Sequence, residues 1–143
     1  MKTKKYTLDF EDTEDFEVLA VCSHYPDYRL VWTVNKFAGL ELQRVEQKYA
    51  CYSRKGELLA EHVQFRYFDE NSDTEYVLLK NKEQRNFLVP ELELVDYLLF
   101  ISTSHQYPTE EIRNILNGCE DIVAVYKVDS TRIKSLAKLD VYG

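Results

Sequence analysis

Residues 87–102 read FLVPELELVDYLLFIS and contain the most hydrophobic run of the chain, residues 97–101. Such a run predicts a central β-strand, which we place at residues 95–102. Pro90 has no backbone N–H group and would interrupt a strand ladder, so residues 87–89 are expected to form a separate short strand that ends there. Asp96 needs its own explanation, because an unpaired carboxylate within an apolar row is costly.

The length and composition indicate one globular domain over residues 1–143. A chain of this size buries about 68–70% of its surface on folding, enough for a hydrophobic core without a metal or a disulfide. Apolar residues make up 45% of the chain, and its 4 glycines and 3 prolines argue against long disordered segments. The 11 tyrosines suit a core with wet edges or a contact surface. Most of them fall in strand-like segments, which favours the core.

The charge pattern excludes some partners. The formal net charge of −7 argues against nucleic-acid binding, which depends on Lys and Arg at the phosphates. The lysines near the N-terminus precede no apolar segment of a secretory signal, and no apolar run reaches the roughly 20 residues that span a bilayer. We therefore expect a cytoplasmic protein with no membrane association and no nucleic-acid partner.

The N-terminal part contains two strand patterns separated by acids. Alternating apolar residues predict a strand at residues 6–10, and the acidic stretch EDTEDFE, residues 11–17, is interpreted as a solvated loop rather than a cation site. Residues 16–22 fit both a strand and a helix capped by Thr13, and we favour the strand.

A helix is predicted over residues 26–38. Pro26 and Asp27 suit its first turn, and Gly39 follows its last. Phe37 belongs to the predicted apolar stripe, whereas Thr33 is on the predicted solvent side. A strand is expected directly afterwards, at residues 40–43.

The rest of the chain predicts a hairpin and a second strand–helix–strand unit. Residues 62–67 and 74–80 alternate across the polar turn DENSD, which is typical of an antiparallel hairpin. A helix is expected at residues 108–117, with Gly118 just past its end. Residues 122–128 are apolar on both faces and predict a buried strand, and a last helix begins near Ser130.

This order of elements resembles a ferredoxin-like α+β sandwich with additions, in which two β-α-β units flank a hairpin. The sheet should be mainly antiparallel, with helices on one face. The opposite face would then be covered by tyrosines, by a partner subunit or by the terminal helix.

The opening stretch also resembles a known signature. Val89-Pro90-Glu91, followed after three residues by Val95-Asp96-Tyr97, is similar to the signature of the IPExxxVDY family, small Bacteroidetes proteins without an assigned function; valine here replaces the first isoleucine. Further similar positions are Ser23, residues 27–30, Trp32, Asn35 and Lys36. The resemblance implies a cytosolic bacterial protein and brings no activity, cofactor or catalytic residue.

Glu91 and Asp96 allow a structural and a functional interpretation. In the structural one, Asp96 accepts backbone N–H bonds from the turn around Pro90, or pairs with Arg29 or Lys36, and fixes the start of the strand. In the functional one, Glu91 and Asp96 form a carboxylate pair for acid–base chemistry or for a cation.

Cys22 and His24 are the other chemical candidates, as a thiol nucleophile and its base. The three cysteines are far apart and form no CxxC pair, so reduced thiols are expected. His62 and His105 lack the spacing of metal ligands, and the glycines form no phosphate-binding loop. We expect neither a metal nor a cofactor.

Together these features favour a non-catalytic protein-interaction or regulatory module that binds a protein partner or itself. Tyr28 and Trp32 lie one turn apart on the predicted helix and form either a contact patch or the edge of the core. The alternative is a small enzyme using Cys22 with His24, or Glu91 with Asp96.

Overall fold

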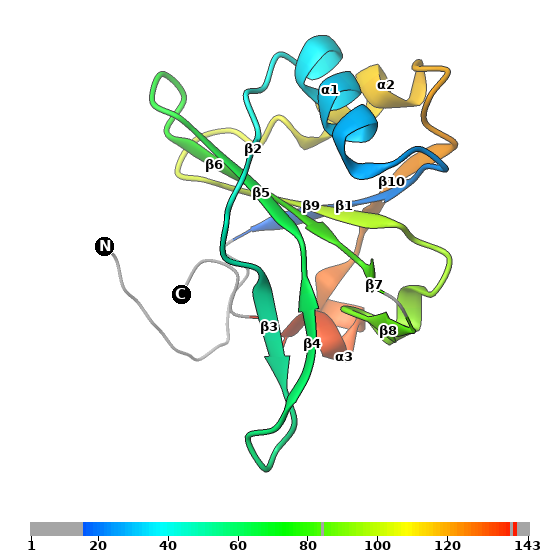
Figure 1. The fold of residues 1–143 in the computed structure, drawn as a ribbon. Coiled ribbons are helices and arrows are strands. Elements are labelled where there is room, and N and C mark those ends of the chain that lie inside the picture. Colours follow the sequence, from blue (N-terminus) through cyan, green and yellow to red (C-terminus); the bar gives the residue numbers. More distant parts are fainter. Residues whose placement is uncertain (1–15, 84, 138, 140–143) are drawn as a thin grey trace.

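The computed structural model describes residues 16–83, 85–137 and 139, and its centre is a six-stranded sheet (Figure 1). The strand order is β10-β1-β9-β6-β5-β2, and every neighbouring pair is antiparallel. The strands are β1 (Glu17–Cys22), β2 (Gln43–Arg44), β5 (Gln64–Asp69), β6 (Thr74–Lys80), β9 (Tyr97–Thr103) and β10 (Ala124–Val128). The prediction of an α+β protein with a mainly antiparallel sheet is confirmed.

The apolar run of the opening stretch forms β9, the buried centre of this sheet. It pairs with β1 on one side and with β6 on the other, and all residues from Tyr97 to Ile101 are buried. The strand begins two residues later than predicted, because Val95 belongs to a turn in which its N–H donates to the carbonyl of Leu92.

One face of the sheet is covered by α1 (Asp27–Ala38) and α2 (Thr109–Asn117), which lie on the same side (Figure 1). Tyr97, Leu99 and Ile101 of β9 join a hydrophobic cluster that includes Leu30 of α1 and Ile112 of α2. Successive strand residues point to opposite faces, so these three side chains share one face.

The other face is also covered from within the chain. Leu98 and Phe100 of β9 pack in a second cluster with Val89, Val95 and Leu136. Leu136 belongs to the terminal helix α3 (Lys134–Ala137), and Val89 immediately precedes the short 3₁₀ helix η1 (Pro90–Leu92). Of the three covers expected for this face, the terminal helix is the one that the structure shows, and residues 89–95 join it there.

The segment at residues 16–22 is a strand, as favoured: residues 17–22 form β1, and its four central residues are buried. The buried face of α1 differs from its prediction, since Phe37 is 50% exposed and Thr33 is fully buried. The Thr33 hydroxyl donates to the Asp121 carboxylate at 3.0 Å, so this side of the helix faces the protein.

Both long helices are tied to later backbone by an asparagine. Asn35 in the last turn of α1 exchanges two hydrogen bonds with the backbone of Leu42, at 2.9 and 3.1 Å. Asn117 does the same with Val125, at 2.8 and 2.9 Å. The predicted strand at residues 40–43 begins later than expected. The Asn35 side chain occupies the Leu42 backbone that a strand would use, and β2 begins at Gln43.

The predicted hairpin is confirmed as β5 and β6. The predicted buried strand at residues 122–128 is instead the edge strand β10, with Tyr126 and Lys127 exposed, because β10 has β1 as its only neighbour within the described sheet.

The final helical segment begins at Ser130 as the 3₁₀ helix η2 (Ser130–Arg132) and continues in α3. The predicted strand at residues 6–10 and most of the acidic stretch lie outside the described residues.

Two small sheets were not predicted. β3 (Tyr49–Tyr52) and β4 (Leu58–His62) form a hairpin that extends away from α1 and α2, and β7 (Lys82–Glu83) pairs with β8 (Asn86–Phe87) (Figure 1). Of the expected strand at residues 87–89, only Phe87 is in a strand, β8. The N–H groups of Leu88 and Val89 instead donate to Asn81. In the described part of the chain, no helix is long and apolar enough to cross a membrane.

Candidate functional site

The residues from Val89 to Tyr97, which we call the signature segment, are organised around one buried side chain, Asn81. Its Nδ2 group donates to the carbonyls of Leu92 and Val95 at 2.9 and 2.8 Å, and its Oδ1 atom accepts from the Val89 N–H at 2.8 Å. The Asn81 backbone also bonds to Leu88 and Asp96. Asn81 therefore adds to the hydrogen bonds within the loop before β9, in which Leu92 bonds to Val89 and Val95 to Leu92. Asn81 was missed in the sequence, where it reads as an ordinary residue after a strand.

Glu91 and Asp96 bind different parts of the molecule. The Glu91 carboxylate accepts the Ser135 N–H of α3 at 3.3 Å. The Asp96 carboxylate accepts the Ser23 N–H at 2.8 Å and lies 3.5 Å from Lys82 Nζ. These contacts do not form the paired carboxylates that acid–base chemistry would need. The structural interpretation of Asp96 is right in kind, but its partners are Ser23 and Lys82 instead of the turn around Pro90 or a lysine or arginine of α1.

Tyr97 extends the same cluster towards the start of α1. Its hydroxyl donates a hydrogen bond to the Asp27 carboxylate, which also lies 3.2 Å from Lys80 Nζ. Burial raises the pKa of Tyr97 far above its usual range, and the negative charge of Asp27 adds to the effect. Tyr97 therefore stays neutral near pH 7 and acts as a hydrogen-bond donor.

These groups line an open pocket of about 440 Å³, formed by Ser23, His24, Tyr25, Pro26, Asp27, Lys80, Lys82, Asp96 and Tyr97. Ser23, Asp27, Asp96 and Tyr97 are positions on which the family resemblance rests. The structure brings the first two next to the last two, across a separation of 73 positions for Ser23 and Asp96 and of 70 for Asp27 and Tyr97. Both lysines already pair with a carboxylate. A ligand would have to displace those ion pairs, which weakens the case for a reactive centre.

Cys22 does not have the features of a nucleophile. Its thiol donates to the Leu94 carbonyl at 3.5 Å, and burial together with the negative charge of Asp96 raises its pKa. A catalytic thiol needs the opposite shift, because the thiolate is the attacking species. His24 is exposed and lines the pocket.

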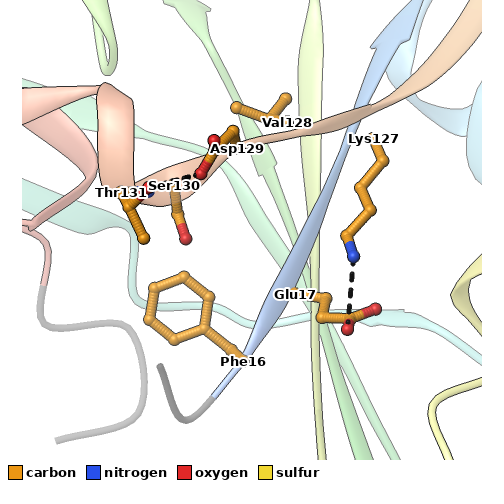
Figure 2. A pocket seen from close by; sticks show the side chains of 7 residues that line it. All are labelled: Phe16, Glu17, Lys127, Val128, Asp129, Ser130 and Thr131. Atoms are coloured by element: carbon orange, nitrogen blue, oxygen red, sulfur yellow. Dashed lines mark hydrogen bonds and ion pairs between the residues drawn. The ribbon is translucent and has the colours of Figure 1, made fainter. Parts of the chain in front are cut away.

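A second pocket, of about 400 Å³, lies beside the start of β1 (Figure 2). Glu17 and Lys127 form an ion pair of 3.4 Å across β1 and β10. The Asp129 carboxylate accepts the Thr131 hydroxyl at 2.6 Å, and hydrogen bonds from Thr131 lower the pKa of Asp129. The charged groups of this pocket thus bind one another or neighbouring residues and stabilise the local backbone.

The outer face of α1 carries a different kind of surface. Tyr28 is 76% exposed and Trp32 is 48% exposed, so the contact-patch interpretation of this pair is favoured over the core edge. The cation of Arg29 lies 5.0 Å from the ring centre of Trp32, and that of Lys36 lies 4.8 Å from the same ring. Tyr25 also contacts the Arg29 cation, at 5.6 Å. We call these residues, with Phe37, the α1 stripe.

The stripe is held in place by Asp121. Its carboxylate binds Arg29 at 3.0 Å and accepts the Thr33 hydroxyl, while its carbonyl accepts the Ser23 hydroxyl at 3.2 Å. Sequence reasoning found Tyr28 and Trp32 but missed the roles of Arg29, Lys36 and Phe37. The spacing of Tyr25, Arg29, Trp32 and Lys36, at three or four residues, could have indicated them.

Among the residues that the structure describes, no group of three or more His, Cys, Asp or Glu side chains could hold a metal ion. A scan against protein-family models and searches of curated proteins and of solved structures gave no match.

Proposed function

We propose that the protein is a non-catalytic protein-interaction module and that the α1 stripe is its binding surface. The observation that carries this proposal is the concentration of exposed aromatic side chains on α1 and just before its first turn. Tyr25, Tyr28, Trp32 and Phe37 are 43%, 76%, 48% and 50% exposed. Aromatic residues and arginine are enriched at the centres of protein–protein interfaces, where tryptophan and tyrosine supply much of the binding energy.

The two cations of the stripe define the chemistry of the partner. Arg29 lies one turn before Trp32 and Lys36 one turn after it, and both cations lie over the Trp32 ring. Arg29 is also paired with Asp121 at 3.0 Å, so Lys36 supplies the positive charge that a partner would meet, in a chain whose net charge is −7. A partner with carboxylates around an apolar or aromatic anchor would complement both features, because opposite charges steer association and the anchor supplies buried area.

The experiment compares proteins captured by the immobilised chain and by three variants. Trp32→Ala and Tyr28→Ala should each remove a captured protein that the wild type retains, with at least a tenfold loss of affinity for Trp32→Ala, as expected for a central aromatic anchor. Tyr126→Ala is the matched control, because Tyr126 is 43% exposed on the distant strand β10. An identical set of proteins bound by all four chains would contradict the proposal.

The alternative, a small enzyme, has less support. Cys22 has a raised pKa, Glu91 and Asp96 have separate partners, and the lysines of the pocket are paired. Self-association through an open sheet face also lacks support, since each face is covered by one of the two hydrophobic clusters.

We further propose a ferredoxin-like core consisting of β1-α1-β6-β9-α2-β10, with β2, β5 and the β3–β4 hairpin as additions. The strand order β10-β1-β9-β6 and the position of α1 and α2 on one face support it. Membership of the IPExxxVDY family and a cytoplasmic location are likewise proposals, supported by the signature residues and by the sequence pattern.

A further inference from the structure

The pocket that contains Lys82 and Asp96, which we call the mixed-charge pocket, is lined by charges of both signs. Lys80 and Lys82 supply its cations, and Asp27 and Asp96 supply its carboxylates. Its volume of about 440 Å³ lies within the range of small-molecule sites. The formal charges of these side chains cancel, so the lining as a whole favours neither an anion nor a cation.

The two ion pairs of the pocket are not equally available to a ligand. Lys80 Nζ lies 3.2 Å from the Asp27 carboxylate and 4.0 Å from that of Glu83. Lys82 Nζ lies 3.5 Å from Asp96 Oδ1 and makes no second ion pair in the described part of the chain. The Lys80 pair thus belongs to a larger network, and the Lys82 pair is the one that opens more readily.

The Asp96 carboxylate divides its two oxygens between the backbone and the pocket. Oδ2 accepts the Ser23 N–H at 2.8 Å, whereas Oδ1 faces Lys82. The side chains of Lys82 and Asp96 are 37% and 27% exposed, and ion pairs that are partly open to solvent contribute little to stability. The pair can therefore open at small cost while the Ser23 N–H keeps Asp96 in position.

The pairing decides which class of ligand suits the pocket. A ligand with only a carboxylate would bind Lys82 and leave Asp96 without a cation. A ligand with only an amine would bind Asp96 and leave Lys82 without an anion. A ligand that carries both groups pairs with each of them, so that no charge is left unpaired. The arrangement therefore selects a zwitterion.

We propose that the mixed-charge pocket binds a free α-amino acid, with the ligand's carboxylate on Lys82 and its ammonium group on Asp96 Oδ1. In an α-amino acid both groups are bonded to one carbon atom, so they are close enough to enter a single opened ion pair. Tyr25 and Pro26, which also line the pocket, offer apolar surface to the ligand's side chain. The site shares only Tyr25 with the α1 stripe, and this binding goes beyond the function proposed above.

Three ligands of the same shape test the charge requirement. L-phenylalanine carries both groups, 3-phenylpropionate lacks the amine and phenethylamine lacks the carboxylate. Isothermal titration calorimetry should show saturable binding of L-phenylalanine with a Kd on the order of 0.1–1 mM, since the pocket is open to solvent. The other two ligands should bind at least about tenfold more weakly, because each leaves one charge unpaired. No saturable binding of L-phenylalanine, or equal binding of all three, would overturn the proposal.

Two variants test the assigned contacts. Lys82→Gln leaves Asp96 unpaired, so the preference should move from L-phenylalanine to phenethylamine. Asp96→Asn leaves Lys82 unpaired and should favour 3-phenylpropionate instead, while its amide oxygen can still accept the Ser23 N–H. A merely structural role of the ion pair would not reverse the preference in opposite directions. Equal weakening of all three ligands, or an unchanged preference in both variants, would refute the assigned contacts.

Lys127→Gln is the matched control. Lys127 also lines a pocket and pairs with a carboxylate, that of Glu17, at 3.4 Å (Figure 2). The same substitution there should leave the binding of L-phenylalanine unchanged, and a loss equal to that of Lys82→Gln would place the binding elsewhere. Trp32→Ala should also bind L-phenylalanine like the wild type, although it is expected to lose the captured protein. The two proposals can therefore fail separately.

Discussion

Asn81 uses every polar atom of its side chain and its backbone in the loop that precedes β9. Two carbonyls and one N–H of that loop bond to the side chain alone, and Asn81 itself is fully buried. The residues from Pro90 to Val95 belong to no strand, so their backbone groups lack the partners of a strand ladder. The buried amide supplies the partners instead.

Asn81→Asp is expected to lower the free energy of unfolding by about 3 kcal/mol or more, although the two side chains have the same shape. Aspartate keeps the acceptor for Val89 but places an oxygen against the carbonyls of Leu92 and Val95. Urea unfolding followed by circular dichroism measures the loss. Asn114→Asp, on the exposed face of α2, is the control and should change stability by less than about 0.5 kcal/mol. A similarly small effect at Asn81 would show that the loop is held by other contacts.

At the scale of elements, the junction between β4 and β5 depends on His62. The ring is fully buried, and because the Lys80 carbonyl can only accept, Nδ1 carries the proton of that hydrogen bond. Nε2 is buried without a hydrogen-bond partner among the described residues. Burial lowers the pKa of His62 from its usual value, despite the nearby carboxylate of Glu83, which acts in the opposite direction.

This lowered pKa predicts how stability depends on pH. Above the unfolded-state pKa of 6.5, both states hold a neutral His62, and its contribution to stability is complete. As the pH falls below 6.5, the unfolded chain takes up a proton that the folded chain resists, so stability falls, by at most about 1.4 kcal/mol per pH unit. Urea unfolding between pH 7.5 and 5 should show this decline.

His62→Gln supplies the control for that measurement. It keeps a side chain that can donate to the Lys80 carbonyl but cannot titrate, so the decline below pH 6.5 should become shallower. An equal slope in the wild type and the variant would assign the pH dependence to other groups.

At the scale of the whole molecule, two hydrophobic clusters lie on opposite faces of one sheet, and the second is closed by the C-terminal segment. Leu136 of α3 is 1% exposed in that cluster, although α3 has only four residues. So short a helix has little stability of its own, and its position must come from this packing.

Leu136→Ala is expected to lower the free energy of unfolding by about 2–4 kcal/mol, as for other buried leucines replaced by alanine. Thermal and urea unfolding should show one cooperative transition at a lower midpoint. Leu94→Ala is the matched control, since Leu94 is 79% exposed, and it should have almost no effect. Equal stability of the two variants would mean that the second face does not need α3.

Much of the architecture could be predicted because its pattern is local. The run at residues 97–101 is apolar on both faces and forms the central strand, and the alternation at residues 62–67 and 74–80 forms a hairpin. β10 could not be distinguished from a buried strand, since Val125 and Val128 look alike whether the strand lies inside the sheet or at its edge. For the candidate site, Tyr28 and Trp32 were found from their spacing. The spacing of Arg29 and Lys36 is compatible with a contact to Trp32, but only the side-chain orientations show that both cations lie over its ring.

The sequence by itself determined the α+β class, the main strands and helices, and the signature segment of Val89 to Tyr97. Each of these follows from the preferences of neighbouring residues and from the period of their apolar side chains. Only the tertiary structure decided that Asn81 holds this segment, that Asp96 pairs with Lys82 and that Tyr97 bonds to Asp27. These partners are far apart along the chain or lie on different elements, and the physical reason is that a buried polar group takes whichever partner the fold brings within reach.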